Sequence, residues 1–182
     1  MLPKQQLMHT TSSMAANKMY RQETSIDENE KKKGHAWIWV CFLAYLFALF
    51  YVLFFAEAFG RTGQSEEYRY NLTLFQEIGR YFRMIESGAW MPFSINIVGN
   101  VVVFIPFGVF MPMLFPKCKN VLLTTLLSLE FSIIIEVIQL VSRVGSFDVD
   151  DLLLNALGGL CGVFVFCVGT AVRKRKDDKH RR

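Results

Sequence analysis

Residues 121–172 read VLLTTLLSLEFSIIIEVIQLVSRVGSFDVDDLLLNALGGLCGVFVFCVGTAV, with two apolar blocks on either side of a short polar turn. A helix rises 1.5 Å per residue, so each block is long enough to cross a hydrocarbon core about 30 Å thick. The turn contains Arg143 and the three aspartates Asp148, Asp150 and Asp151. The stretch therefore predicts two membrane-spanning helices joined by a polar connection.

The same kind of apolar block occurs twice more in the 182 residues, which are 52% hydrophobic and have a mean hydropathy of +0.28. The predicted spans are residues 36–56, 96–115, 121–141 and 152–172. This pattern predicts an all-α membrane protein with four transmembrane helices in one domain, residues 36–172. We expect a polar, disordered arm at residues 1–35 and a basic tail at residues 173–182.

The basic residues are distributed unevenly among the segments outside the apolar blocks. Of the 20 Lys and Arg residues, six precede the first block, two lie between the second and third, and seven follow the fourth. Because cytoplasmic segments carry an excess of Lys and Arg, this distribution predicts a multi-pass protein of the cell membrane with both termini cytoplasmic. The net charge of +4 then reflects topology and contacts with anionic lipid at the cytoplasmic face, and no nucleic-acid partner is expected.

The first outer loop carries an amphipathic pattern. Four apolar residues recur at i, i+3, i+7 and i+10: Phe75, Ile78, Phe82 and Ile85. This spacing predicts a helix lying on the outer membrane surface, with Trp90 at the headgroup level. Thr73 and Gln76 match a capping box at its start, and Ser87-Gly88 predicts its end. The helix is either a surface spacer or a lid over a site.

The third span carries a polar stripe. Ser132, Glu136, Gln139 and Arg143 recur at i, i+4, i+7 and i+11, which places them on one face of a helix. Because hydrocarbon cannot solvate a polar side chain, such a stripe faces the interior of the bundle. Glu130 lies off this stripe; it is either protonated or paired with a partner subunit, so a homo-oligomer stays possible.

The other spans bring polar residues to the same outer depth. The expected binding cluster consists of Asn100, Glu136, Gln139, Arg143, Asp148, Asp151 and Asn155. Asp148 or Asp150 is also expected to cap the fourth span, where acids complement the helix dipole. A carboxylate in hydrocarbon costs several kcal/mol unless it is partnered or hydrated, so this set favours a ligand site over simple packing.

Four residues are expected to shape the helices. Pro106 removes a backbone hydrogen bond in the second span and predicts a kink, and Gly108 weakens the turn that follows. Gly158 and Gly162 form a GxxxG face that lets another helix approach closely.

The sequence shows no complete catalytic set. The three histidines, His9, His35 and His180, lie in or beside the predicted cytoplasmic segments. The cysteine spacing fits no metal motif, so we expect neither a metal, a cofactor nor a disulfide. Enzymatic activity is therefore the less favoured interpretation.

Four motifs resemble the VanZ-like family of small integral membrane proteins: NLTLF from residue 71, NIVGNVVVFIPFGVFMP from residue 96, SIIIEVIQ from residue 132 and GSFDVDDLLLNALGGLCG from residue 145. The family is associated with bacterial resistance to teicoplanin-type glycopeptide antibiotics, which carry an acyl tail. The resemblance implies a cell-envelope protein whose polar cluster binds a membrane lipid, an amphiphile or a lipid-linked wall precursor from the outer leaflet. An intramembrane enzyme acting on an envelope lipid and a small transporter are the alternatives.

Overall fold

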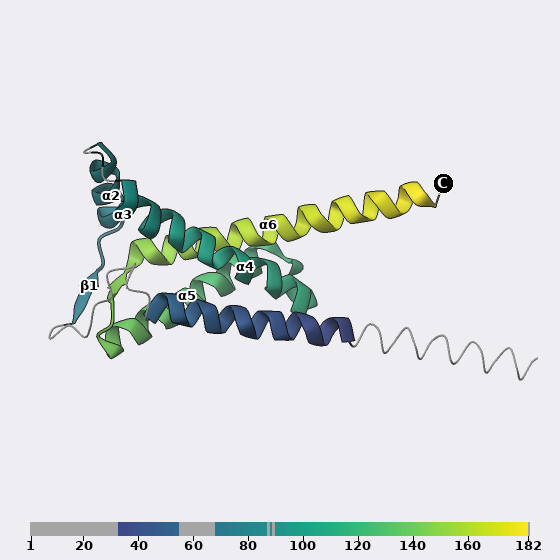
Figure 1. The fold of residues 1–182 in the computed structure, drawn as a ribbon, viewed down its shortest axis with the longest axis horizontal. Helices are drawn as coiled ribbons and strands as arrows, with labels where there is room; N and C mark the ends of the chain where they lie inside the picture. The colour runs from purple at the N-terminus through teal and green to yellow at the C-terminus, as the bar shows by residue number, and fades with distance from the viewer. Residues whose placement is uncertain (1–32, 55–67, 87, 89, 182) are drawn as a thin grey trace, which may run out of the picture. The chain divides into compact units, whose positions relative to one another are not determined.

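Four helices of the computed structural model are long and apolar enough to cross a membrane, which confirms the predicted fold class (Figure 1). They are Lys33–Phe54, Ser94–Leu114, Val121–Ser142 and Val149–His180. The structure describes residues 33–54, 68–86, 88 and 90–181. Most of the arm predicted to be disordered therefore lies outside the described residues.

The chain divides into two compact units, Met1–Val40 and Cys41–Arg182. In the first unit, the described residues 33–40 are helical. The second unit contains the remainder of the helix Lys33–Phe54, residues 41–54. It then contains β1 (Arg69–Asn71), α2 (Gln76–Glu86), α3 (Trp90–Phe93), the π-helical segment η2 (Ser94–Val98), α4 (Gly99–Leu114), the 3-10 helix η3 (Pro116–Lys119), α5 (Val121–Ser142), β2 (Ser146–Asp148) and α6 (Val149–His180). All that follows on packing concerns this second unit.

The second span begins earlier than the apolar block that predicts it. The backbone stays in the right-handed helical region at Phe93, Val98 and Gly99, so α3, η2 and α4 continue into one another. Helix α4 also continues through Pro106. The kink at Pro106 stays a prediction. Single π-helical turns inside α-helices are often found near functional sites.

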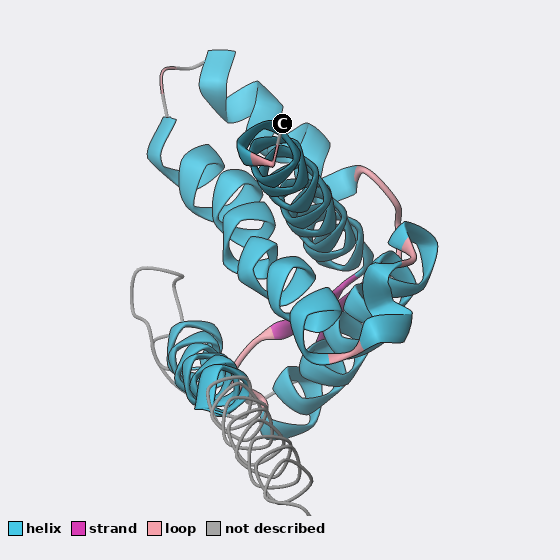
Figure 2. Cartoon of the chain, turned by 90° about the vertical axis from the view of Figure 1, so that its right-hand side faces the viewer, coloured by secondary structure: helices cyan, strands magenta, loops and turns pink. Residues whose placement is uncertain are grey.

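Two short strands, which the sequence did not predict, join the first outer loop to the start of α6. Strand β1 pairs in parallel with β2, with Asn71 opposite Asp148 (Figure 2). Helix α2 leads away from this strand pair at the same end of the unit (Figure 1). We call residues 69–86, from the start of β1 to the end of α2, the cap.

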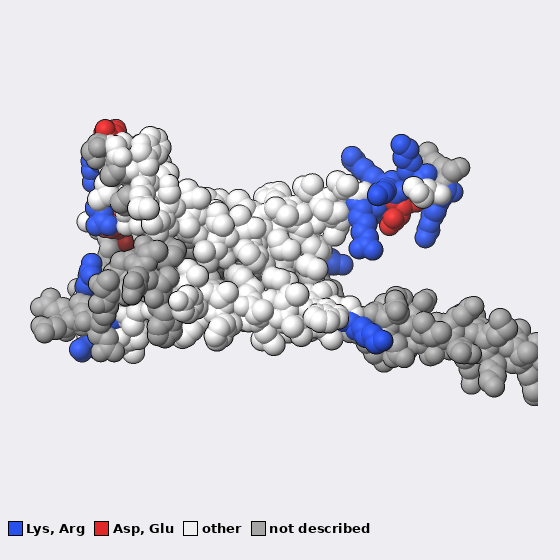
Figure 3. Space-filling view, in the orientation of Figure 1, with Lys and Arg blue, Asp and Glu red and all other residues white. Residues whose placement is uncertain are grey.

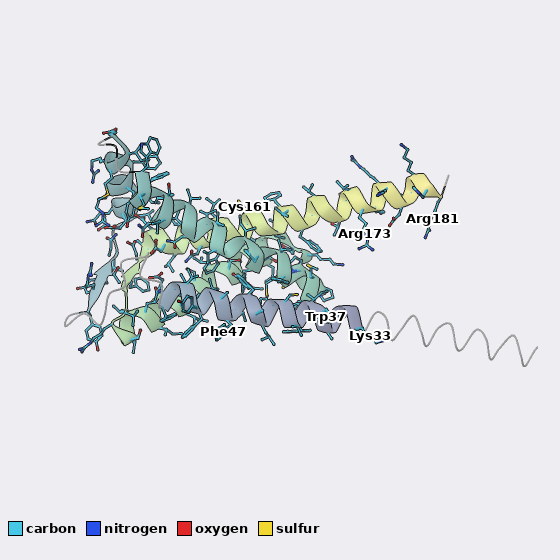
Figure 4. The ribbon with its side chains drawn as sticks, in the orientation of Figure 1. Lys33, Trp37, Phe47, Cys161, Arg173 and Arg181 are labelled. Atoms are coloured by element: carbon cyan, nitrogen blue, oxygen red, sulfur yellow. The ribbon has the colours of Figure 1, made fainter. Side chains whose placement is uncertain are left out.

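Helix α6 is longer than the predicted span, because it continues through the basic tail to His180. Lys and Arg gather at this free end, whereas the visible face along the middle of the helices shows no charged residue (Figure 3). Arg173 and Arg181 project from the end of α6 (Figure 4). Consecutive residues on a helix point in different directions, so the positive charges surround α6 rather than forming one face.

Helices α4 and α6 pack with their backbones in close approach. A Cβ added at Gly158 would lie 2.2 Å from the carbonyl oxygen of Val101, and one at Gly162 would lie 2.1 Å from that of Ile105. On the same seam, a Cβ at Gly108 would lie 2.1 Å from the carbonyl oxygen of Gly159. These glycines therefore form the contact between α4 and α6, as small residues do where membrane helices cross.

Aromatic side chains fill the space beside this crossing. Phe104 is fully buried, and the rings of Phe107 and Phe131 stack with centroids 4.9 Å apart. The helix Lys33–Phe54 joins this core through Phe42, whose ring lies 5.6 Å from that of Phe110. Its outer side carries Phe47, which is 76% exposed and projects away from the bundle (Figure 4).

Replacing Gly158 by Ala should lower the thermal stability of the detergent-solubilised protein. The added methyl group has no room beside Val101, and overpacking costs about 1–3 kcal/mol. The matched control is Gly169→Ala on the same helix, where a Cβ meets nothing within 4 Å. Equal melting temperatures for the two variants would contradict the close approach of α4 and α6.

Candidate functional site

The start of α6 is capped by its own Asp148. The Asp148 side chain accepts a hydrogen bond of 2.8 Å from the backbone N–H of Asp150. Asn71 donates from its side-chain amide to the same carboxylate at 3.3 Å and 3.5 Å to its two oxygens. The two residues face each other across the strand pair, so the cap and α6 meet at this carboxylate.

Asp150 lies two residues after Asp148, and its carboxylate binds backbone N–H groups of the cap. Its Oδ1 accepts from the N–H of Phe75 at 2.6 Å, and its Oδ2 accepts from the N–H groups of Glu77 and Ile78 at 2.9 Å and 3.1 Å. The residue is 1% exposed. Free N–H groups and the positive end of the dipole at a helix start both favour a carboxylate. Asp150 of α6 therefore caps α2.

This contact corrects the capping box predicted at the start of α2. The N–H of Gln76 bonds to the backbone carbonyl of Thr73 at 3.3 Å, not to the threonine hydroxyl. The reason is the turn before the helix, where Phe75 adopts a left-handed φ of 63°. A non-glycine residue in this region costs about 1–3 kcal/mol, which the three hydrogen bonds to Asp150 offset. The predicted end of α2 is confirmed, because the helix stops at Glu86 and Gly88 has a φ of 86°.

Two side-chain pairs connect α6 to its neighbouring helices within the apolar region. Asn100 of α4 donates to Asp151 at 2.5 Å. Asn155 donates to the hydroxyl of Ser132 on α5 at 2.8 Å. Each pair gives a polar group a protein partner where lipid offers none.

Glu136 of α5 completes the connection to the cap. One of its carboxylate oxygens accepts from the backbone N–H of Asp148 at 3.2 Å, and the side chain is 2% exposed. We define the α6 polar network as the residues joined in this way around the start of α6: Asn71, Asn100, Ser132, Glu136, Asp148, Asp150, Asp151 and Asn155. Three bundle helices and the cap thus meet at one end of the second unit.

Two residues of the predicted cluster lie outside this network. The side-chain amide of Gln139 donates to the backbone carbonyl of Leu53 at 2.8 Å and so joins α5 to the helix Lys33–Phe54. Arg143 is exposed, ends α5 with a left-handed φ of 58°, and places its guanidinium 4.7 Å above the ring of Tyr68. Arg143 is therefore available at the surface beside the cap.

One atom of the network has a free hydrogen-bonding position. Among the described residues, Asn155 Oδ1 is the buried side-chain oxygen that lacks a hydrogen-bond partner. Leaving such an acceptor unsatisfied costs roughly 1–3 kcal/mol. No group of three or more His, Cys, Asp or Glu residues in the described part of the chain has an arrangement that could hold a metal ion.

The cap presents an apolar surface to its surroundings. Exposed large apolar residues lie in the cap and in α3, which follows it: Leu72, Leu74, Phe75, Phe82, Trp90 and Met91. The ring of Phe82 also meets that of Phe93 edge to face, with centroids 5.3 Å apart. On α2, the guanidinium of Arg80 lies over the Tyr81 ring and pairs with the carboxylate of Glu77. The amphipathic helix of the sequence pattern is thus present; within α2, Phe82 is exposed, whereas Ile78 and Ile85 are half-buried.

The sequence did not identify three contributors. The sequence predicts Asp150 only as a cap for its own helix, and it gives Asn71 and Gly159 no structural role beyond their places in the family motifs. A Cβ at Gly159 would lie 1.9 Å from the hydroxyl of Ser128 on α5. The pattern Asp-x-Asp-Asp at a helix start offers more carboxylates than one helix needs for capping, and this excess is the signal that could have revealed a second capped helix.

Replacing Asp150 by Asn should free the start of α2. The amide keeps the size of the side chain but removes the charge that strengthens its three hydrogen bonds, which is worth about 1.5–3 kcal/mol. We expect hydrogen exchange at the amides of Glu77 and Ile78 to accelerate roughly 10- to 100-fold in lipid nanodiscs. The control is Asp177→Asn, an exposed acid in α6. Unchanged exchange in Asp150→Asn would contradict the conclusion that the Asp150 carboxylate caps the N-terminus of α2.

Asp148 should make stability depend on pH in a specific direction. Burial raises the pKa of its carboxyl above the usual value and outweighs the hydrogen bonds from the Asp150 N–H and from Asn71, which lower it. A group whose pKa is raised on folding stabilises the fold below its unfolded pKa of about 3.9, and this contribution is lost as pH rises through the folded pKa. Asp148→Asn keeps a capping oxygen but does not titrate. We expect the melting temperature of the wild type to fall relative to this variant as pH rises above about 4; a relative rise would contradict the assignment.

Comparison with known proteins gives one family. The VanZ/LLP1 family matches residues 42–170. Protein VanZ of Enterococcus faecium is 32% identical over 102 residues, which cover 53% of this chain and 51% of that protein. The chain therefore spans about half the length of this relative, and no solved structure matches it. Since the matched region contains α4, α5, the network and most of α6, the chain belongs to the VanZ/LLP1 family.

Proposed function

We propose that this protein acts in the bacterial cell envelope and raises tolerance to teicoplanin-type lipoglycopeptides by binding an amphiphile at the cap. The amphiphile is the acylated antibiotic itself or a lipid-linked wall precursor. Family membership supports the link to the envelope. The excess of Lys and Arg in the segments at the opposite ends of the helices supports an outward-facing cap.

The observation that carries this proposal is the Asp150 contact. A carboxylate from a spanning helix holds the start of α2, so an amphipathic helix is fixed where the apolar spans end. A helix in that position lies at the boundary between headgroups and acyl chains. The exposed apolar side chains of the cap, such as Leu74 in the turn before α2 and Phe82 on α2, are suited to contact an acyl tail.

Cations beside the cap supply the complementary headgroup contacts. Arg143 is exposed at the end of α5, and Arg80 and Arg83 are exposed on α2. Guanidinium groups pair well with phosphates and carboxylates, which occur in lipid-linked precursors. The site therefore has an apolar part and a cationic part next to each other, as an amphiphile requires.

The buried network has a positioning role in this proposal. Glu136 and Asn155 are each 2% exposed, so a ligand does not reach them in the observed arrangement. They hold α5 and α6 together below the cap, through Asp148 and Ser132. Loss of either contact changes the surface that the ligand meets without removing a ligand contact.

Expression of the wild type in a sensitive host should raise the minimum inhibitory concentration of teicoplanin several-fold, with a smaller effect on vancomycin, which lacks the acyl tail. Glu136→Gln should remove most of the gain at matched membrane levels, because a neutral amide is a weaker acceptor for the Asp148 N–H. The control is Asp177→Asn, which removes an exposed carboxylate at the far end of α6 from the cap. Equal tolerance with and without the wild-type protein would refute the proposed function.

A second pair of variants tests whether the amphiphile binds the exposed surface beside the cap, without altering the buried network. Trp90 is 61% exposed beside the cap, and Trp37 is 69% exposed on the helix Lys33–Phe54. Trp90→Ala should reduce teicoplanin tolerance while leaving thermal stability unchanged, whereas Trp37→Ala should alter neither. Full tolerance in Trp90→Ala would show that the cap surface does not bind the amphiphile.

A further inference from the structure

Glu130 is an acidic residue on the outside of a spanning helix. It lies about 13 Å along the helix from Val121 and about 18 Å from Ser142, near the middle of α5. Its side chain is exposed, whereas Glu136 on the same helix is buried in the network. The two glutamates therefore point to different surroundings, one to the bundle interior and the other to the surrounding membrane.

An exposed carboxyl at this depth needs a partner. A charged group at the centre of a bilayer costs several kcal/mol, and even a neutral carboxyl loses hydrogen bonds there. Among the described residues, no hydrogen bond or ion pair involves Glu130. Residues 36–54, 94–114, 121–142 and 149–172 contain no Lys or Arg, so these spans supply no cation at this depth.

The residues around Glu130 form a regular apolar surface. Leu126, Ile134 and Val137 lie at i−4, i+4 and i+7, and each is 44% exposed or more. This stripe is suited to pack against another helix as well as against lipid. Glu130 lies at its centre.

We propose that this face of α5 binds a second copy of the chain, with the two Glu130 carboxyl groups hydrogen-bonded to each other. A two-fold axis along the membrane normal places the same residue of each copy at the same depth and in contact. A protonated carboxyl is both donor and acceptor, so two of them satisfy each other without a counter-charge. The spans contain no basic residue that could pair with Glu130, whereas the Glu130 of a second copy supplies both a donor and an acceptor. The inference does not depend on the proposed function.

Cross-linking tests the interface. Cys41, Cys118, Cys161 and Cys167 are first replaced by Ala, and a single cysteine is introduced at Ile134, one turn from Glu130. Oxidation in liposomes at a high lipid-to-protein ratio should produce a disulfide-linked dimer. The matched control is Leu157→Cys, on α6, which is 47% exposed and lies at a similar depth, since its neighbour Asn155 bonds to Ser132. No dimer at Ile134, or equal yields at both positions, would overturn the proposal.

Two substitutions then test the carboxyl pair itself on the Ile134→Cys background. Glu130→Leu should weaken dimerisation roughly tenfold, because one hydrogen-bonded pair between membrane helices is lost. Glu130→Gln should retain the dimer, because an amide is also both donor and acceptor. An unchanged dimer in Glu130→Leu overturns the proposal. Thermal melting is used to check that this variant is folded, and we expect it to unfold in a single cooperative transition.

Discussion

A carboxylate next to a hydrocarbon core must find its hydrogen-bond donors within the protein, and Asp150 finds three of them at the start of α2. The turn before α2 and the pairing of β1 with β2 both place these donors next to Asp150. The N–H groups of Phe75, Glu77 and Ile78 converge on one carboxylate only because Phe75 adopts a left-handed conformation. Strand β1 brings the chain to that turn by pairing with β2, which directly precedes α6. The contact of Asp150 thus depends on the left-handed turn at Phe75, on the β1–β2 pair and on the start of α6.

Below the cap, close packing of helices brings the polar groups together. The glycine seam allows α4 to approach α6 so closely that Asn100 reaches Asp151. On the other side, Gly159 leaves room for α5, and Ser132 meets Asn155 one turn away. Small residues and polar pairs therefore act together: the former set the distance between helices, and the latter fix their register along each other. A larger residue in the seam would separate the polar pairs as well as the backbones.

The sequence predicts the spans well because each is a long apolar block, and hydrocarbon thickness sets its length. It also predicts α2 and its end at Gly88, since both depend on local pattern and on a residue that tolerates positive φ.

The sequence does not predict the contact between Asp150 and the cap, because Asp150 and Phe75 are 75 positions apart and no local signal connects them. The strands were missed for a related reason: three residues each are too few to show alternation, and only their partner makes them strands. Of the predicted cluster, the structure joins Asn100 to Asp151 and Glu136 to Asp148, but Arg143 stacks on Tyr68 and Gln139 binds Leu53. A helical stripe predicts which face a residue occupies, not which partner it meets.

Asp150 is expected to hold the cap in one position on the bundle within a membrane. Distance measurement by electron paramagnetic resonance tests it most directly, with spin labels on cysteines introduced at Glu86 in α2 and at Val168 in α6, and the native cysteines replaced by Ala. Both sites are exposed and belong to the same unit. In lipid nanodiscs we expect one narrow distance distribution for the otherwise native chain and a broad one for Asp150→Ala. A broad distribution in the native chain, or the same narrow one in both, would contradict it.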